Sequence, residues 1–467
     1  MNGLREKARS GAKAAKSIPQ GLKPTSILLF LCQGLIPGLP LERDFPQPLN
    51  FTRGCEQEGD NRLKAGTFSL RKLGWGILFL GAASLCWASD VHTNPLNRDP
   101  LVREGYDHFY NLDFPGAIER FERFHAAHPG DPQGTVMLLE AVIFQELYRQ
   151  DLLDTTFYAN DGFLTGRHAT EEDPKMRDRI FALADEVVNE ANWRLASNPN
   201  DVDALYARGW SRALRCTYVA MVERAYGTGF RLATKAKDDG MRVLQLDPNY
   251  VDAKVIVGVY EYVVGALPLP FKLLIGFVGI TGSKTRGLEM LTDDGNRGIT
   301  TSMEARTAIA LFLRREARYK QAIEVIRGLK ASYPRDYLFW LEEANLRKDA
   351  GEGMGAVDAY REIIGANAKP GFFFQARMEL AYFGLGDALR GQRHYSEAAQ
   401  AYEQAAWTEG IGPELKIRSL LAAGECHDLN GERQLAVKDY RAAIASGPET
   451  SRADTARKHL RNAYTGN

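Results

Sequence analysis

Cysteine is scarce in this sequence of 467 residues, which contains five cysteines and no pair at C-x-x-C spacing. That spacing carries zinc ribbons, thioredoxin-type redox centres and covalent haem attachment, so motifs of those three kinds are excluded. Cys216 and Cys426 lie 210 residues apart. We interpret both as small buried apolar residues rather than as a disulfide or a metal-binding pair.

The sequence also has no net charge, because its 59 Lys and Arg residues balance its 59 Asp and Glu residues. The two ends of the chain differ slightly. Residues 1–88 hold 12 basic and 6 acidic residues, which leaves 47 basic and 53 acidic residues in 89–467. A mildly acidic surface repels a phosphate backbone, so we predict that the protein has no nucleic-acid partner.

Catalytic motifs are absent as well, since the sequence contains no H-E-x-x-H zinc motif and no nucleophile elbow. Gly282-Ser283-Lys284-Thr285 resembles part of a phosphate-binding loop, but that loop needs Lys directly after its second Gly. His108, His125 and His128 form at most a partial metal site, because imidazoles on an amphipathic surface are usually solvated. We therefore expect no catalytic residue, cofactor or metal, and we predict that the protein is not an enzyme.

No apolar run reaches the roughly 20 residues that a membrane-spanning helix needs. The apolar stretch 74–85 follows the basic pair Arg71-Lys72 and precedes Cys86-Trp87-Ala88, which places small residues before a cleavage site. This order is typical of a secretory signal peptide. We predict that residues 63–88 are a signal peptide cut before Ser89, and that the mature protein is periplasmic or secreted in a bacterial envelope.

Residues 1–62 contain another basic and then apolar stretch, at 27–31, followed by a Pro-, Gly- and Arg-containing run without periodicity. Signal peptides normally start within a few residues of the initiator. We interpret residues 1–62 as a non-native or disordered N-terminal extension. The alternative is that the two apolar stretches form one anchor.

The second half of the chain contains a regular repeat. Ala322 and Ala356 are 34 residues apart, which is the period of the tetratricopeptide repeat (TPR), and Ala398 and Ala436 follow after 42 and 38 residues. Five windows match the TPR pattern when position 1 is Arg98, Met303, Tyr337, Glu379 or Ile417. Each has a small residue at positions 8 and 20, and four have an aromatic residue at position 24. Small residues let the two helices of a hairpin approach closely, and the aromatic ring fills the remaining gap.

We therefore predict an all-α fold for residues 90–465, a right-handed superhelical TPR-like solenoid of six to eight antiparallel helix hairpins. Residues 90–300 are expected to form divergent TPR-like hairpins with insertions. Residues 301–465 are expected to form regular repeats that end in a polar capping helix at 452–464. Within the first part, Asn160-Asp161-Gly162 predicts a short β-hairpin at 155–165. The apolar insertion at 265–282 is interpreted as a buried crossover or, alternatively, as a lipid-facing wedge.

The second insertion carries a family resemblance. Gly258-Val259-Tyr260-Glu261, Ala266-Leu267-Pro268, Lys272-Leu273-Leu274 and the run Gly276–Gly282 resemble the eukaryotic inclusion-body-clearance family of TPR proteins associated with the mitochondrial outer membrane. The resemblance implies a non-enzymatic adaptor that touches lipid droplets or membranes. The secretory signal departs from that family, and a bacterial periplasmic relative is the simpler interpretation.

A partner of a TPR solenoid binds the concave face formed by the first helices of the hairpins, through repeat positions 2, 5, 9, 12 and 13. Projecting these positions onto the sequence gives the candidate partner-binding residues Tyr106, Phe109, Tyr110, Arg314, Arg315, Asn345, Lys348, Phe383, Asp387, Arg390, Arg418 and Glu425. Their mixture of cations, amides and rings suits an extended peptide or an acidic tail. The TPR carboxylate clamp is not supported, because Leu341 occupies its Lys position. We predict a scaffold that binds a protein or peptide, with a membrane- or lipid-associated accessory protein using 266–282 as the alternative.

Overall fold

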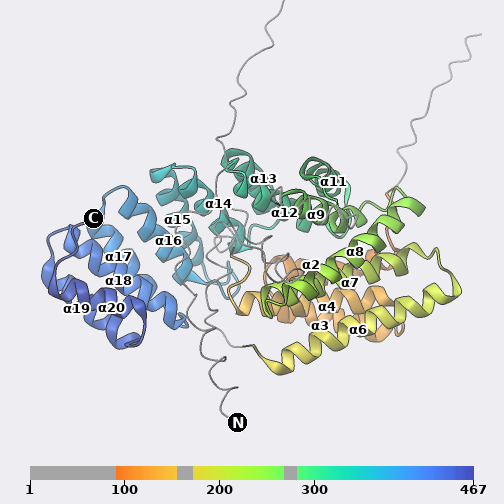
Figure 1. The fold of residues 1–467 in the computed structure, drawn as a ribbon, viewed down its shortest axis with the longest axis horizontal. Helices are drawn as coiled ribbons and strands as arrows, with labels where there is room; N and C mark the ends of the chain where they lie inside the picture. The colour runs from red at the N-terminus through yellow and green to blue at the C-terminus, as the bar shows by residue number, and fades with distance from the viewer. Residues whose placement is uncertain (1–90, 155–171, 268–280, 467) are drawn as a thin grey trace, which may run out of the picture. The chain divides into compact units, whose positions relative to one another are not determined.

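The computed structural model describes residues 91–154, 172–267 and 281–466. Within these ranges the chain forms 17 α-helices and one short 3-10 helix, η1 at Pro95–Arg98. Successive helices pack as antiparallel pairs (Figure 1). The predicted β-hairpin at 155–165 lies outside the described residues, as does most of the apolar insertion. None of the described helices combines the length and the apolar character needed to cross a membrane.

Eight helix pairs follow one another in the described residues, and each pair packs on the next. The pairs are α2 (Pro100–Tyr110) with α3 (Phe114–Ala127), α4 (Pro132–Arg149) with α6 (Pro174–Ser197), α7 (Val202–Met221) with α8 (Tyr226–Leu246), α9 (Ala253–Gly265) with α11 (Lys284–Arg297), α12 (Ser302–Arg315) with α13 (Tyr319–Ser332), α14 (Tyr337–Asp349) with α15 (Gly353–Asn367), α16 (Met378–Gly391) with α17 (Tyr395–Ala406), and α18 (Pro413–Leu429) with α19 (Arg433–Ser446). A final helix, α20 (Ser451–Arg461), packs on α19.

Aspartate caps the N-termini of many first helices. The Asp131 carboxylate accepts a hydrogen bond from the Gln133 amide at 2.9 Å, and Pro132 occupies the first turn of α4. Asp336 caps α14 in the same way through the Leu338 amide at 2.8 Å. These side chains accept hydrogen bonds from amide groups that have no partner within the helix. The first turn tolerates proline because the amide hydrogen that proline lacks would have no helical partner there.

The turn inside each matched repeat has one shared backbone feature. The residue at repeat position 15 has a positive φ in all five windows, between 56° and 78°. These residues are Leu112, Ala317, Gly351, Arg393 and Gly431. A left-handed residue at the end of the first helix stops the helix and reverses the chain. Five occurrences at one position confirm the register predicted from the sequence.

Hairpins with glycine at position 8 are held close by contact between that glycine and an aromatic ring. A Cβ atom added at Gly386 would lie 2.6 Å from Tyr402, and one added at Gly424 would lie 2.6 Å from Tyr440. Tyr402 and Tyr440 are themselves almost fully buried. Because no side chain separates helix from ring, repeat positions 8 and 24 are in direct contact, as the sequence pattern predicts.

The all-α solenoid of antiparallel hairpins predicted from the sequence is therefore confirmed in the described residues. Tyrosine hydroxyl groups also form hydrogen bonds within the hairpins, which the repeat pattern did not predict. Tyr360 donates a hydrogen bond to Asn345 at 2.5 Å, and Tyr402 donates one to Asp387 at 2.7 Å. In both repeats the hydrogen bond joins the side chain at position 24 to the side chain at position 9.

We predict that Gly424→Ala destabilises the protein, whereas Gly365→Ala stabilises it. Alanine normally stabilises a helix relative to glycine by roughly 0.5–1 kcal/mol, and an alanine at Gly365 meets nothing within 4 Å. At Gly424 the new methyl group collides with Tyr440, and such overpacking costs about 1–3 kcal/mol. Urea unfolding of both variants measures the difference. Equal effects of the same sign would contradict the close contact.

Candidate functional site

The first two hairpins contact hairpins that lie much later in the chain. Tyr110 on α2 donates a hydrogen bond to Glu304 on α12 at 2.7 Å, and its ring lies 4.9 Å from the ring of Tyr333. The Tyr148 hydroxyl on α4 donates to the carbonyl oxygen of Gln375 at 2.8 Å, in the segment before α16. These contacts place α2 against α12 and the end of α13, and α4 against the segment before α16.

A partly buried ion pair adds to this contact. Arg377 lies 2.5 Å from Asp151, and it also pairs with Glu379 at 2.7 Å. Burial raises the pKa of Asp151 to about 6, although the Arg377 charge acts in the opposite direction. The same hydrophobic core cluster contains residues of α2, α4, α14 and α16. Part of the face that we expected to bind a partner is therefore covered by the chain itself.

The candidate residues of the first repeat lie in this internal contact. Phe109 is buried, and Tyr106 and Tyr110 are partly buried and stacked on each other with their ring centres 5.7 Å apart. The Tyr106 hydroxyl donates to Glu140 at 3.2 Å. In this structure the three side chains serve packing between hairpins, and none of them lines an open groove.

Two further candidates are buried as well. The Arg314 guanidinium is 4% exposed and pairs with Glu342 at 2.8 Å and with Asp349 at 2.6 Å. Asn345 is buried and accepts the hydrogen bond from Tyr360. Arg315, the next residue after Arg314, is partly buried. These positions match the concave pattern in sequence but contribute to structure rather than to an accessible surface.

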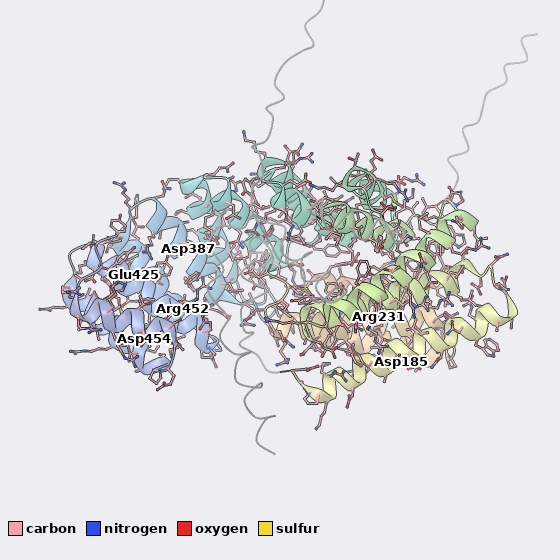
Figure 2. All side chains as sticks on the ribbon, viewed as in Figure 1. Asp185, Arg231, Asp387, Glu425, Arg452 and Asp454 are labelled. Atoms are coloured by element: carbon pink, nitrogen blue, oxygen red, sulfur yellow. The ribbon has the colours of Figure 1, made fainter. Side chains whose placement is uncertain are left out.

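The remaining candidates come together on the C-terminal hairpins, where Asp387 and Glu425 are labelled in Figure 2. Lys348 pairs with Asp387 at 3.3 Å, and Arg390 pairs with Glu425 at 2.8 Å. The Arg418 guanidinium lies over the Phe383 ring at 4.6 Å from its centre. The sequence places six of these residues on the predicted concave face, and we call this set the C-terminal groove: Lys348, Phe383, Asp387, Arg390, Arg418 and Glu425.

Arg418 is the exposed member of the C-terminal groove. The two carboxylates that act on it electrostatically are Asp387 and Glu414. Asp387 already pairs with Lys348 and accepts the Tyr402 hydrogen bond, and Glu414 already pairs with Arg452. Its charge therefore remains less neutralised than those of Lys348 and Arg390. A cation on an aromatic face is a suitable site for a carboxylate with an adjacent apolar group.

A second region of interest lies in the interior, between α7, α8 and α9. An apolar cavity of about 300 Å³ is lined by Phe144, Trp210, Ile256, Val259, Val263 and other residues, with Glu304 among its few polar lining groups. The Oε2 atom of Glu304 is buried and has no hydrogen-bond partner among the described residues. Burial raises the pKa of Glu304 to about 7.

Several other carboxyl groups share this electrostatic character. Burial raises the pKa of Glu140, and the charge of Glu304 raises it further. Asp294 is fully buried and accepts a hydrogen bond from the Thr301 hydroxyl at 3.0 Å, and burial followed by the Asp252 charge raises its pKa to about 9. Glu140 and Asp294 lie outside the five matched windows, so the repeat pattern does not predict them. Glu304 is at position 2 of the window that starts at Met303, but the projection onto the concave face did not select it.

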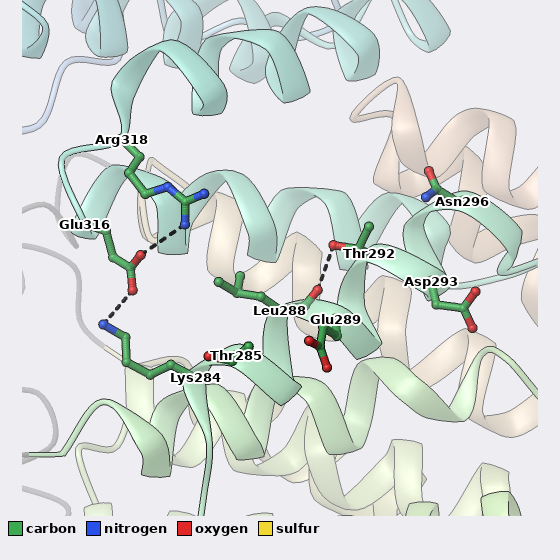
Figure 3. A pocket seen from close by; sticks show the side chains of 9 residues that line it. All are labelled: Lys284, Thr285, Leu288, Glu289, Thr292, Asp293, Asn296, Glu316 and Arg318. Carbon is green, nitrogen blue, oxygen red and sulfur yellow. Dashed lines mark hydrogen bonds and ion pairs between the residues drawn. The ribbon is translucent and has the colours of Figure 1, made fainter. Parts of the chain in front are cut away.

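A polar surface depression of about 700 Å³ lies along α11 and the end of α12 (Figure 3). At its edge Lys284 lies 2.5 Å from Glu316, which also pairs with Arg318 at 3.4 Å. Lys284 belongs to the segment that resembles a phosphate-binding loop, and its ammonium group is thus paired with a carboxylate. Glu289 and Asp293 add further acids to the depression, which makes it a poor surface for a phosphate.

The three histidines considered as a partial metal site have separate partners. His108 lies 2.6 Å from Asp113, and His128 faces the Phe124 carbonyl oxygen at 3.0 Å. His125 contacts the Thr135 hydroxyl. The two cysteines within the described residues, at 216 and 426, are free thiols.

Comparisons with known proteins found no matching family model and no matching curated protein. Solved structures to which this chain is similar include a tetratricopeptide repeat protein from Parabacteroides merdae. The identity is 14% and the TM-score is 0.29, and the match covers 68% of this chain and 97% of that chain. The human IFIT1 dimer with m7Gppp-AAAA has 11% identity, a TM-score of 0.35 and coverage of 78% and 82%. Yeast Tom70 has 11% identity, a TM-score of 0.34 and coverage of 78% and 88%. The TPR-like assignment of this chain rests on its helix pairs and repeat register.

We predict that the unfolding free energy decreases as the pH rises from about 4.5 to 7, and that Glu304→Gln reduces this decrease. The folded protein keeps a proton on Glu304 up to about pH 7, whereas the unfolded chain releases it near its ordinary pKa. Stability from this proton is therefore present at low pH and lost as the pH rises. The reduction should exceed about 1 kcal/mol, since one pKa unit corresponds to roughly 1.4 kcal/mol. Urea unfolding at a series of pH values measures it.

Glu289→Gln, on the exposed side of α11, controls for the removal of one carboxylate. Identical pH profiles for the wild type and Glu304→Gln would show that Glu304 is ionised in the folded protein across this range.

Proposed function

We propose that this chain is a non-enzymatic scaffold that binds a protein or peptide partner at the C-terminal groove. The observation that carries the proposal is the exposed Arg418 guanidinium over the Phe383 ring. A guanidinium presents a planar set of donors to a carboxylate, and the ring offers an apolar face beside it. This combination fits an acidic side chain or a C-terminal carboxylate next to an apolar residue.

The charges around Arg418 favour such a partner. Lys348 and Asp387 neutralise each other, as do Arg390 and Glu425. Glu414 and Arg452 form a third pair beside Arg418. An acidic group that approaches Arg418 therefore meets three compensated pairs and one cation. A basic peptide would meet that same cation and no unpaired acid of the C-terminal groove. Electrostatic complementarity of this kind sets which partner binds more than how tightly it binds.

The internal contact of the first hairpins supports the same location. Tyr106, Phe109 and Tyr110 are engaged by packing and by hydrogen bonds to Glu140 and Glu304. A partner would have to displace these contacts to use the N-terminal part of the predicted face. The C-terminal groove needs no such rearrangement, because its side chains are paired within or between neighbouring hairpins.

We also propose that the scaffold works in the bacterial envelope, in the periplasm or outside the cell. The proposal rests on the basic, apolar and small-residue order of residues 70–88. The contacts of the first described residues are compatible with such a cut. His92 donates its amide hydrogen to Asn249 at 3.0 Å and stacks on Tyr250 at 4.7 Å. A cut before Ser89 would leave this docked segment, and the helices behind it, intact.

We expect that Arg418→Glu reduces recovery of the partner about tenfold or more, because a carboxylate replaces the guanidinium that would receive an acidic group. The test is a cross-linking pulldown from native envelope extract with the mature chain as bait, quantified by mass spectrometry. Arg361→Glu is the matched control, since Arg361 forms an exposed ion pair with Glu397 and lies on a second helix. Unchanged thermal unfolding of both variants establishes that they fold.

Equal recovery of the same partner by Arg418→Glu and Arg361→Glu would rule out the C-terminal groove as the binding surface. Once a partner segment is known, a synthetic peptide with a free C-terminus can be compared with its C-terminal amide. Weaker binding of the amide would identify the terminal carboxylate as the group held by Arg418.

The proposed location makes a separate prediction. Signal peptidase should cut between Ala88 and Ser89, since small residues at Cys86 and Ala88 fit the two pockets that the enzyme requires. Intact-mass and N-terminal analysis of protein isolated from its native cells measures the mature start. A chain that retains residues 1–62, or one found in the cytosol, would contradict the processing and the compartment together.

A further inference from the structure

Three consecutive helices near the C-terminus each direct one side chain to a common point. Glu403 on α17, His427 on α18 and Asp439 on α19 each offer one nitrogen or oxygen atom, and these atoms all lie within 4.8 Å of one another. His427 Nε2 lies 3.6 Å from Asp439 Oδ2 and 4.0 Å from Glu403 Oε1. All three side chains belong to regular hairpins rather than to loops.

Two of the three side chains are deeply buried and lack a partner at the atom that faces the others. The side chains of His427 and Asp439 are 5% and 3% exposed. Neither His427 Nε2 nor Asp439 Oδ2 has a hydrogen-bond partner among the described residues. Buried polar atoms in folded proteins are almost always paired, so two unpaired atoms facing each other need an explanation.

The hydrogen bond of the other imidazole nitrogen, Nδ1, determines whether Nε2 is a hydrogen-bond donor or an acceptor in the neutral ring. His427 Nδ1 lies 2.7 Å from the Glu432 carboxylate, which can only accept a hydrogen bond when ionised. This contact assigns a hydrogen to Nδ1, so in the neutral imidazole Nε2 carries a lone pair directed at two carboxylates. Three acceptors then face one another with no donor between them, an arrangement that a cation would stabilise.

We propose that Glu403, His427 and Asp439 bind one divalent transition-metal ion, for which Zn²⁺ is the best fit. One imidazole and two carboxylates are common zinc ligands, and the two negative charges balance the ion. Ligands at about 2.0–2.1 Å from a tetrahedral ion lie roughly 3.4 Å apart. The distances of 3.6 and 4.0 Å from His427 Nε2 therefore require only a small contraction, and the two carboxylates, which lie within 4.8 Å of each other, move together as the ion binds. The Glu432–His427 contact matches the carboxylate that typically orients a metal-binding histidine.

A nearby cation is the natural competitor for this position. Lys438 Nζ lies 3.8 Å from Glu403, but its side chain is 69% exposed and is free to turn toward solvent. The other alternative is a proton on Nε2, which would let the imidazolium donate to Asp439. At 3.6 Å the two atoms are farther apart than a hydrogen bond allows. A metal ion accounts for Glu403 as well as for Asp439.

The metal would join α17, α18 and α19 across two hairpins. Helix α18 also carries Arg418 and Glu425, so the ion would stiffen one wall of the C-terminal groove. A ligand that binds only the folded state stabilises it by mass action. Metal binding can be measured separately from partner binding, because none of the three proposed ligands belongs to the C-terminal groove.

The test is isothermal titration of the chelator-treated chain with ZnCl₂, together with thermal unfolding with and without Zn²⁺. We expect one ion per chain and an increase in the unfolding temperature. His427→Ala and Asp439→Asn should abolish this binding, and Glu403→Gln should weaken it. Glu432→Gln should weaken it by about 10- to 100-fold, as is typical when the carboxylate behind a metal-binding histidine is changed.

His394→Gln is the matched control, because His394 also pairs with a carboxylate, Glu397 at 3.0 Å, but is half exposed and belongs to no such cluster. Circular dichroism spectra recorded in the presence of chelator check that each variant folds. Glu403→Gln should disturb the fold least, because Glu403 is only partly buried. Co²⁺ absorption bands that require His427 would show direct ligation. Absence of Zn²⁺ binding by the folded wild type, or equal binding by wild type and a folded Glu403→Gln, would overturn the proposal.

Discussion

The contact between a glycine on the first helix and a buried tyrosine ring on the second is the constraint on which the two C-terminal hairpins, α16 with α17 and α18 with α19, depend. At Gly386 and Gly424 the tyrosine ring occupies the space where a Cβ atom would stand. A larger residue would push the helices apart, and the next hairpin would then lose the surface on which it stacks. Because each hairpin contacts mainly its neighbours, a local separation would spread along the solenoid.

The tyrosines at repeat position 24 also determine which first-helix side chains remain accessible to a partner. Tyr360 and Tyr402 donate hydrogen bonds to Asn345 and Asp387, both at repeat position 9. A buried hydroxyl needs an acceptor, so this position serves the interior in these repeats. Asn345 is buried as a result, whereas Asp387 keeps its second oxygen for Lys348. One position in the pattern therefore has both a structural and a surface role.

The fold could be predicted from the sequence because its signals are local and repeated. The alanine at position 20 and the aromatic residue at position 24 recur together, and the turn at position 15 follows from the same register. The candidate site was less predictable. Projection onto a concave face assumes that the face is open, but Tyr110 contacts Glu304 across 194 residues. Contacts between distant hairpins depend on curvature, which a single repeat does not encode.

The cluster of Glu403, His427 and Asp439 was missed for a related reason. Its members come from three helices, at spacings of 24 and 12 residues, and no short motif joins them. Metal motifs found in sequence place two ligands within one turn or one loop. In a solenoid, ligands from neighbouring helices converge instead because each repeat holds its helices in the same relative position. The close packing that the glycine–tyrosine contacts impose is thus also what brings these three side chains within reach of one another.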